Sequence, residues 1–277
     1  DPSDLRSEVL SILSLQDVDL LNLHVFRRGY DARKKSNIHF IYTVDLQFSA
    51  EVDISFLISK CHLQITPDME YKPVFSAIEG NSYTNTPGYK RPVVVGTGPC
   101  GLFAALTLAQ LGLRPLVIER GKAVRERTKD TWGFWRKQIF NQESNVQFGE
   151  GGAGTFSDGK LWTQAKDRRH LGRKVMEEMV KGGAPEEILY VSKPHVGTFR
   201  LVKIVEYLRS EIERLGGEIR FSSRVENIVV EAGGIRGLET LNMISGERSE
   251  IDANQVVLAV GHSARDTFEM LHSRGVF

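Results

Sequence analysis

The stretch that decides the fold reads Val93-Val94-Val95-Gly96-Thr97-Gly98-Pro99-Cys100-Gly101. Three β-branched residues in a row are typical of a strand that is buried on both faces, and the glycines that follow have the spacing G-x-G-x-x-G. Gly96 permits a tight turn, Gly98 lets a pyrophosphate approach the backbone, and Gly101 lets the next helix pack on the strand. The pattern therefore predicts a dinucleotide-binding turn, with Pro99 at the start of the helix.

The chain after this turn supports the same interpretation. An apolar helical pattern runs to Gly112, and residues 115–119 read as a second buried strand, so that 92–120 form one βαβ unit. Glu119 ends this strand, 18 positions after Gly101, where a carboxylate can accept hydrogen bonds from the ribose hydroxyls. Because two anions would repel each other, Glu119 argues against a 2′-phosphate and thus against NADP in this pocket.

Three features favour FAD over NAD. The strand ends Glu119-Arg120-Gly121, an ending frequent in flavoproteins, which adds Arg120 to the candidate binding residues. A long insertion, about 122–254, precedes the returning strand 255–261, and flavin domains interrupt the fold at this point to build a substrate region. The apolar run that ends in Gly261 is typical of the strand that passes beneath the FAD pyrophosphate. An NAD-dependent dehydrogenase without flavin is the alternative.

The sequence predicts two domains. Residues 1–90 read as a small α+β module and linker, with strands at 21–26, 39–48 and 62–66, a helix at 54–59, and linker composition over 79–92. Residues 91–277 read as an FAD-binding α/β domain. The predicted fold class is α/β: an FAD/NAD(P)-binding Rossmann-like domain with a small N-terminal α+β module and an inserted substrate region.

Parts of the insertion also carry local signals. The apolar spacing over 198–215 predicts a helix that ends at Gly216-Gly217, followed by a strand at 218–221. Gly233-Gly234 predicts a hairpin between the strands 227–231 and 235–240. Ser263 and Asp266 have the spacing of a capping box for the last helix. The aromatic patch Trp132–Phe140 is interpreted as core.

Three blocks resemble a known family. Phe148-Gly149-Glu150-Gly151-Gly152-Ala153-Gly154-Thr155-Phe156-Ser157-Asp158-Gly159-Lys160-Leu161 is similar to the signature of the uncharacterised FAD-dependent dehydrogenases, which are NAD(P)/FAD-dependent oxidoreductases. The block 194–198 and the block 261–266 resemble two further parts of that family, and residues 29–35 match its N-terminal module. The resemblance spans the whole chain.

The resemblance implies FAD as cofactor, with Gly151 and Gly152 near the flavin. By analogy, the backbone of Val225 meets the adenine. The usual Ala-Thr-Gly end of the returning strand is here Ala259-Val260-Gly261, which puts the threonine contact in doubt but keeps the glycine. Family members are longer, so we expect this chain to be an N-terminal portion that lacks the C-terminal segment completing the flavin site.

Flavin carries the redox chemistry, so no acid–base triad is required. Lys160 is a candidate cation beside the flavin and His195 a candidate proton donor, although a solvated lysine and a structural histidine are the blander interpretations and the more favoured ones. His262 follows the strand-end glycine and could approach the cofactor. Cys100 reads as a packing residue, because no partner thiol is near in sequence.

Composition excludes several classes of protein. Lys plus Arg is 36 and Asp plus Glu is 35 in 277 residues, so net charge gives no argument for nucleic acid or a membrane surface. The two cysteines, Cys61 and Cys100, are too few for a disulfide framework, and a cytoplasmic setting, or the stroma of a plastid, is expected. Basic residues at 27–35 favour a solvated hairpin turn over an RNA contact. No metal site is predicted.

The function predicted from these observations is that of an FAD-dependent oxidoreductase whose electrons pass through bound flavin, with NAD(P)H as a candidate electron donor. The substrate, the electron acceptor and the oligomeric state are left open by the sequence. The alternative from a different class is a non-catalytic dinucleotide-binding scaffold, with the N-terminal module as a partner-docking domain.

Overall fold

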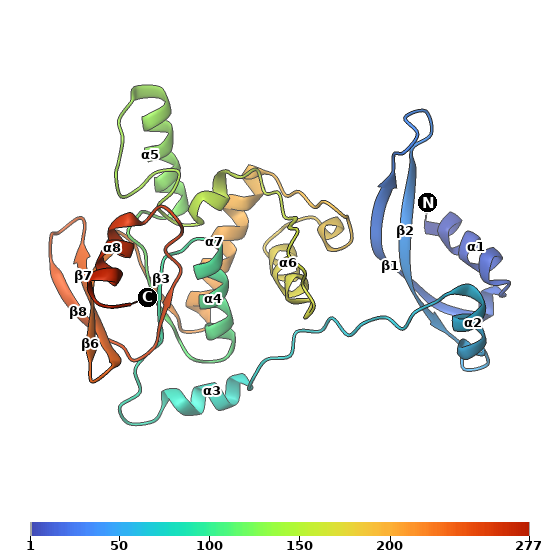
Figure 1. The fold of residues 1–277 in the computed structure, drawn as a ribbon, viewed down its shortest axis with the longest axis horizontal. Coiled ribbons are helices and arrows are strands. Elements are labelled where there is room, and N and C mark those ends of the chain that lie inside the picture. Colours follow the sequence, from blue (N-terminus) through green and yellow to red (C-terminus); the bar gives the residue numbers. More distant parts are fainter. Residues whose placement is uncertain (1, 277) are drawn as a thin grey trace. The chain divides into compact units, whose positions relative to one another are not determined.

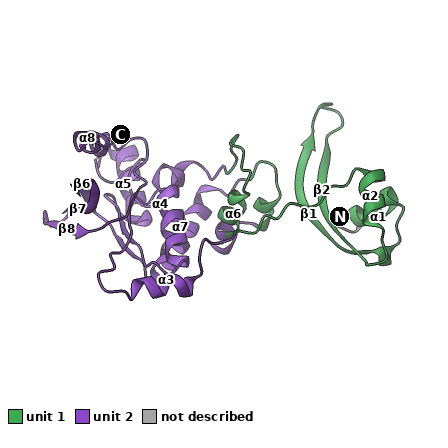
Figure 2. Ribbon diagram, turned by 60° about the horizontal axis from the view of Figure 1, so that its bottom comes forward, with its two compact units in different colours: residues 1–71, 161–177, 186–194 green, residues 72–160, 178–185, 195–277 purple. Residues whose placement is uncertain are grey.

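The computed structural model describes residues 2–276, which divide into two compact units. Unit 1 comprises residues 1–71, 161–177 and 186–194, and unit 2 comprises residues 72–160, 178–185 and 195–277 (Figure 2). The sequence placed 161–177 and 186–194 in the second domain, whereas in the structure both stretches cluster with the N-terminal module.

Unit 1 is built on one antiparallel hairpin and two helices. Strand β1 (Leu20–Asp31) pairs with β2 (His39–Phe48), and helices α1 (Pro2–Leu13) and α2 (Ile54–Cys61) accompany it, with the short 3-10 turn η1 (Asp17–Asp19) before β1. Val9, Leu13 and Leu20 are buried together, and apolar residues of β2 pack on them. Strands β1 and β2 and helix α2 confirm the elements predicted at 21–26, 39–48 and 54–59, and α2 is capped by the Asp53 side chain.

Arg28 explains why part of the insertion joins unit 1. Its backbone N–H donates to the carbonyl of Tyr190 and its carbonyl accepts from Ser192, so that residues 190–192 lie along β1. The guanidinium of Arg28 lies over the rings of Phe40 and Tyr190, at 5.3 and 5.4 Å from their centres. The turn η3 (Glu186–Leu189) leads into this contact.

Two predictions for the N-terminal region are wrong. Residues 62–66 form no strand, since within residues 2–276 this segment pairs with no other strand. The hydroxyl of Thr66 donates a hydrogen bond of 2.8 Å to the side chain of Asp45 in β2. The linker 79–92 overlaps helix α3 (Ala77–Thr84), which begins at a capping box made by Ser76 and Glu79. Linker composition concealed the helix because its turn-forming residues also serve as caps.

Unit 2 contains a parallel four-stranded sheet in the order β5-β4-β3-β9, with β4 (Leu116–Ile118) and β3 (Val93–Val95, labelled in Figure 1) in the centre. Strand β5 (Glu218–Arg220) lies at one edge and β9 (Val256–Leu258) at the other. Helix α4 (Pro99–Gln110) connects β3 to β4 and packs against α7 (Thr198–Arg214). This arrangement is the predicted Rossmann-like α/β fold.

The second face of the parallel sheet is covered by an antiparallel sheet and a helix. Strands β6 (Ser223–Glu231), β7 (Gly234–Asn242) and β8 (Arg248–Asp252) form the antiparallel sheet, and α8 (Arg265–Ser273) packs beside it. Val93, Val95 and Ile118 share a core with Ile228, Leu238 and Leu271. The hairpin predicted at Gly233-Gly234 is confirmed by the pairing of Glu231 with Gly234.

Three further expectations for unit 2 are corrected. The returning strand is shorter than the predicted 255–261, since β9 spans Val256–Leu258, and it lies at the edge of the sheet with Leu258 40% exposed. The capping box at Ser263 and Asp266 does not form: Ala264 is the N-cap of α8, and Asp266 pairs with Arg120 instead. The aromatic patch is not core. Its residues lie at the end of α5 (Val124–Lys137) and after it, contact each other edge to face, and are largely exposed, with Trp135 at 55%.

Helix α6 (Leu171–Lys181) and the 3-10 helix η2 (Gly152–Phe156) complete the element order. Helix α6 begins in unit 1 and ends in unit 2. Within the described residues, no helix is both long and apolar enough to cross a membrane.

Candidate functional site

The glycine turn after β3 has the geometry that each glycine was predicted to allow. Gly96 has a φ of +102°, and a methyl group there would lie 2.5 Å from the carbonyl oxygen of Ala259. A methyl group on Gly101 would lie 1.9 Å from the carbonyl oxygen of Gly96, so helix and turn touch directly. Gly98 is different: its nearest neighbour would be the Cα of Gly152 at 3.9 Å. Gly98 therefore leaves space that the protein itself does not fill.

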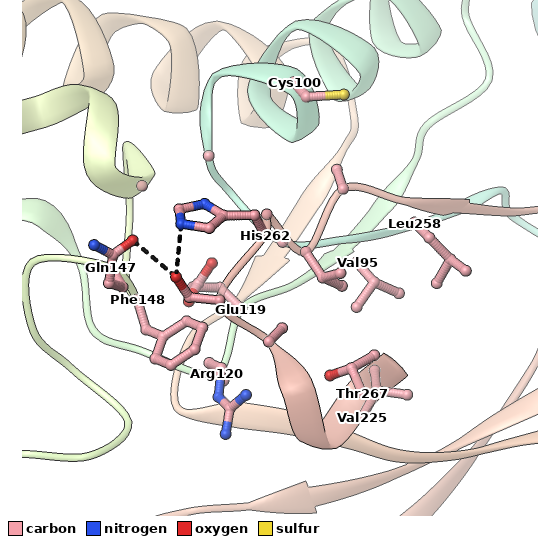
Figure 3. Close-up of a pocket in the computed structure, with 18 of the residues that line it drawn as sticks. Val95, Cys100, Glu119, Arg120, Gln147, Phe148, Val225, Leu258, His262 and Thr267 are labelled. Carbon is pink, nitrogen blue, oxygen red and sulfur yellow. Dashed lines mark hydrogen bonds between the residues drawn. The ribbon is translucent and has the colours of Figure 1, made fainter. Parts of the chain in front are cut away.

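A cavity of about 540 Å³ lies at this turn (Figure 3). Its wall combines the turn with the ends of β4 and β9, the start of β6, the segment 147–154 and helix α8. Eight of the ten predicted cofactor-binding residues line it: Gly96, Gly98, Pro99, Glu119, Arg120, Gly152, Val225 and Gly261. In the part of the chain that the structure describes, Gly101 and Gly151 are not in the wall, because both are packed behind it against the protein. The volume is in the range of sites for small molecules and cofactors.

Helix α4 points its N-terminus at the cavity. Gly98 is its N-cap and Pro99 its first residue, a position where proline is favoured because its missing N–H has no intrahelical partner. The free N–H groups of the first turn and the helix dipole favour an anion there. Together with the space left by Gly98, this end of the cavity suits a pyrophosphate.

Glu119 is the most connected polar residue of the wall. It is 4% exposed, and its Oε2 accepts hydrogen bonds from the backbone N–H (2.9 Å) and the hydroxyl (2.6 Å) of Thr97. Its Oε1 accepts from the N–H groups of Gly121 (2.8 Å) and Gly149 (3.0 Å). The carboxylate thus lines the cavity and at the same time joins the turn, the end of β4 and a second glycine-rich segment, residues 149–159.

Arg120 lies beside Glu119, and its charge is already compensated. Its guanidinium makes two hydrogen bonds to Asp266 (3.0 and 2.9 Å) and one to Glu143 (2.6 Å), and it stacks over the ring of Phe148 at 4.3 Å. Arg224 is likewise bound by Glu143 and Glu226. Both arginines line the cavity without offering a free positive charge, which disfavours a 2′-phosphate as Glu119 does.

The second glycine-rich segment closes directly on the turn. The N–H of Gly151 donates to the carbonyl of Thr97 at 2.8 Å, and a methyl group on Gly152 would lie 2.8 Å from the Cα of Gly98. Glu150, directly before Gly151, is fully buried, with Oε2 accepting from the N–H of Val124 and from Arg209. Burial raises the pKa of the Glu150 carboxyl to about 7, against the lowering effect of those two donors.

Lys160 and His195 come together in the structure, but away from the cavity wall. They pair as an isolated antiparallel bridge, and His195 Nε2 lies 2.8 Å from Asp158 Oδ2. Asp158 also accepts from the Thr198 hydroxyl (3.2 Å), at the start of α7. The hydrogen bond with His195 has the larger effect and the one from Thr198 the smaller, and together they hold the pKa of the Asp158 carboxyl below its usual value. Within residues 2–276 the cavity is lined by neither Lys160 nor His195.

His262, Cys100 and helix α8 complete the wall. The hydroxyl of Ser263 donates to Gln147 (3.2 Å) and lies 3.3 Å from His262 Nε2, which links the end of β9 to the segment before Gly149 (Figure 3). Cys100 is exposed and lines the cavity, so it is not the packing residue expected. Sequence reasoning missed Arg224, Phe148, Thr267 and Phe268; for the α8 residues the sequence carried no signal.

Residues 90–273 match the pyridine nucleotide-disulphide oxidoreductase family, and residues 1–47 match a domain of unknown function. The first match covers more than half of the chain, so the chain belongs to the pyridine nucleotide-disulphide oxidoreductase family. Both cysteines are free thiols, Cys61 in unit 1 and Cys100 in unit 2.

A curated relative, an uncharacterised protein of Clostridium beijerinckii, is 42% identical over 276 residues. The match covers the whole of this chain and 49% of the relative, so the chain spans about half the length of the curated relative it matches. Among solved structures, glycine oxidase from Geobacillus kaustophilus is similar with a TM-score of 0.42 at 15% identity, covering 66% of this chain and 58% of that one. Glycerol-3-phosphate dehydrogenase from Bacillus halodurans, solved with FAD, has a TM-score of 0.42 at 14% identity, covering 71% of this chain and 40% of that one.

Proposed function

We propose that the cavity binds FAD and that the protein is an FAD-dependent oxidoreductase. The observation that carries the proposal is the space beside Gly98, which opens at the N-terminus of α4 and continues past Glu119 to Val225. Membership in a family of pyridine nucleotide oxidoreductases supports the redox function.

The wall suggests how each part of the cofactor would be held. The pyrophosphate would lie against Gly98 and Pro99, where the helix dipole and free N–H groups favour it. The adenosine ribose would lie at Glu119, and the adenine at the backbone of Val225. Gly152 and Gly261 border the same cavity, and the absence of side chains there admits close approach of a flat ring.

Bound FAD supplies the two-electron chemistry, and the residues of the chain bind, orient and move protons. Glu119 and the compensated Arg120 reject a 2′-phosphate, so NADP is excluded from the dinucleotide pocket itself. We infer that a nicotinamide nucleotide serves as electron donor from outside this pocket. We propose His195, oriented by Asp158, as a proton donor to substrate and Lys160 beside it as a cation, in a cluster that lies outside the wall of the cavity.

The test is a titration of the purified protein with FAD, followed by the quenching of flavin fluorescence and by the visible spectrum. The proposal predicts saturable binding, and bleaching of the bound flavin by NADH or NADPH without oxygen. Binding of NAD in place of FAD would favour the NAD-dependent dehydrogenase. Binding of FAD without bleaching by either nucleotide would favour a dinucleotide-binding scaffold.

A further inference from the structure

Arg127 is a buried arginine behind the cavity, on helix α5. Its side chain is 0% exposed, and its guanidinium donates to three backbone carbonyls: Asn145 (2.7 Å), Val146 (2.6 Å) and Glu150 (2.7 Å). A longer contact of 3.4 Å reaches the hydroxyl of Thr155. These four acceptors are neutral groups, and all belong to one segment, residues 145–155.

Keeping a charge in this place is costly. Burial lowers the pKa of Arg127 to about 10, even though the carboxylates of Glu119 and Glu150 favour the charged form. An apolar side chain of similar volume would fill the space without that cost. An apolar side chain could not hydrogen-bond to these carbonyls. The planar guanidinium binds several of them at once and so fixes their positions.

One peptide group connects Arg127 with the dinucleotide turn. The carbonyl of Glu150 accepts from Arg127, and the N–H of the same peptide, which belongs to Gly151, donates to the carbonyl of Thr97 at 2.8 Å. In a planar trans peptide the C=O and the N–H point in opposite directions. Arg127 therefore turns the N–H of this peptide toward the turn that carries Gly98.

The segment 145–155 also packs against the aliphatic part of the Arg127 side chain. Gly149 has a φ of +112°, and a methyl group there would lie 2.5 Å from Cδ of Arg127. The ring of Phe156 lies at 4.9 Å from the guanidinium carbon on another side. Since the N–H of Gly149 donates to Glu119, Arg127 supports the cavity wall at two peptides, 148–149 and 150–151.

We propose that Arg127 is a positioning residue of the cofactor site. Its guanidinium holds the segment 149–154 at a fixed distance from the turn Gly96–Pro99, and this distance sets the width of the slot that admits the pyrophosphate. The inference rests on the proposed function, because it assumes that an adenine dinucleotide enters this slot.

The test compares R127K with R125K. R127K keeps the positive charge but loses the planar guanidinium that donates to several carbonyls. R125K makes the same change two residues away, at an exposed arginine bound to Glu206. Hydrogen exchange of the cofactor-free proteins is measured first. We expect exchange over 145–155 to speed up about tenfold or more in R127K, with 225–240 unchanged and with R125K like the wild type.

The second readout is FAD affinity by flavin fluorescence. We expect the Kd of R127K to rise about tenfold or more, because a small misplacement of a binding segment has large effects, and the Kd of R125K to stay within about twofold. Equal exchange in all three proteins, or faster exchange spread over the whole of unit 2, would overturn the proposal. If R127K does not fold, F156L removes the ring beside the guanidinium, keeps the arginine, and must show the same local pattern. A wild-type protein that binds no FAD would refute the proposed function, while the exchange measurement, which needs no ligand, would still show whether Arg127 orders the segment 145–155.

Discussion

The carboxylate of Glu119 accepts a hydrogen bond of 3.0 Å from the backbone N–H of Gly149, thirty residues further along the chain. Because the same carboxylate also accepts from Thr97, Glu119 joins the first glycine-rich turn to the second glycine-rich segment. The residue predicted to meet the ribose thus also ties together two walls of the cavity. Stability of the fold and binding of the cofactor are therefore coupled at Glu119.

Replacing Glu119 by glutamine should lower both the stability of the fold and the affinity for FAD. The amide group turns one acceptor atom into a donor, which then faces two of the four donors that Glu119 satisfies. We expect E119Q to reduce the free energy of unfolding by about 2–4 kcal/mol, measured by urea denaturation, and to weaken FAD binding. E239Q, at an exposed glutamate of β7, is the control and should change little. An unchanged unfolding free energy in E119Q would show that these hydrogen bonds do not form.

Glu150 should make stability depend on pH near neutrality. Its pKa is raised from 4.5 to about 7 in the folded protein, so between these values the folded state binds more protons than the unfolded state. The contribution of Glu150 to stability therefore falls as pH rises from about 4.5 to 7 and is level above the folded pKa. The groups around it are Arg209 and Glu206 of α7, Glu119, and Arg127.

The variant E150Q tests this dependence, because its amide oxygen can still accept from Val124 and Arg209 while it no longer titrates. Relative to wild type, E150Q should gain about 3 kcal/mol between pH 5 and pH 8. The measurement is urea unfolding at several pH values. Parallel stability curves for the two proteins would mean that the Glu150 pKa is not raised.

Removing Asp266, which compensates the charge of Arg120, should raise the affinity of the cavity for a 2′-phosphorylated nucleotide. Asp266 binds Arg120 through two hydrogen bonds, and D266A would leave the guanidinium with Glu143 as its remaining carboxylate partner at the cavity. We expect D266A to bind 2′-phosphorylated AMP about threefold to tenfold more tightly than wild type, because a cation becomes available to the phosphate. E269A, on the exposed side of the same helix, is the matched control. Equal affinities in D266A and E269A would contradict this role for the ion pair.

Local sequence signals predicted the parts of the fold that depend on neighbours in the chain. The strand 93–95, the turn at Gly96 and Gly98, the helix from Thr198 and the hairpin at Gly233 all follow from residue types and short spacings. Contacts between distant segments had no such signal. The placement of 186–194 beside Arg28, and the pairing of Asp266 with Arg120 in place of a helix cap, depend on the tertiary arrangement.

The site was predicted in the same uneven way. Five of the predicted residues line the cavity because the βαβ motif fixes their positions relative to the turn: Gly96, Gly98, Pro99, Glu119 and Arg120. Gly152, Val225 and Gly261 also line it, and they were predicted from the family resemblance and the returning strand. Arg127 stands out in no motif, since its partners are backbone carbonyls and any residue type can provide these. Every residue has a backbone carbonyl, so the sequence does not indicate which ones accept from an arginine. Close packing restricts a position to glycine, and the sequence shows that.

The binding of FAD beside Gly98 is the central claim, and the affinity of G98A for FAD tests it most directly. Gly98 has a φ of −64°, and an alanine methyl would have its nearest protein neighbour at 3.9 Å, so the fold should accept the substitution. The same methyl group would stand where the pyrophosphate approaches the backbone. The control is G133A in α5, where a methyl group meets nothing within 4 Å. The account predicts that G98A keeps its melting temperature and binds FAD about tenfold or more weakly than G133A and wild type. Equal FAD affinity in G98A, G133A and wild type would contradict it.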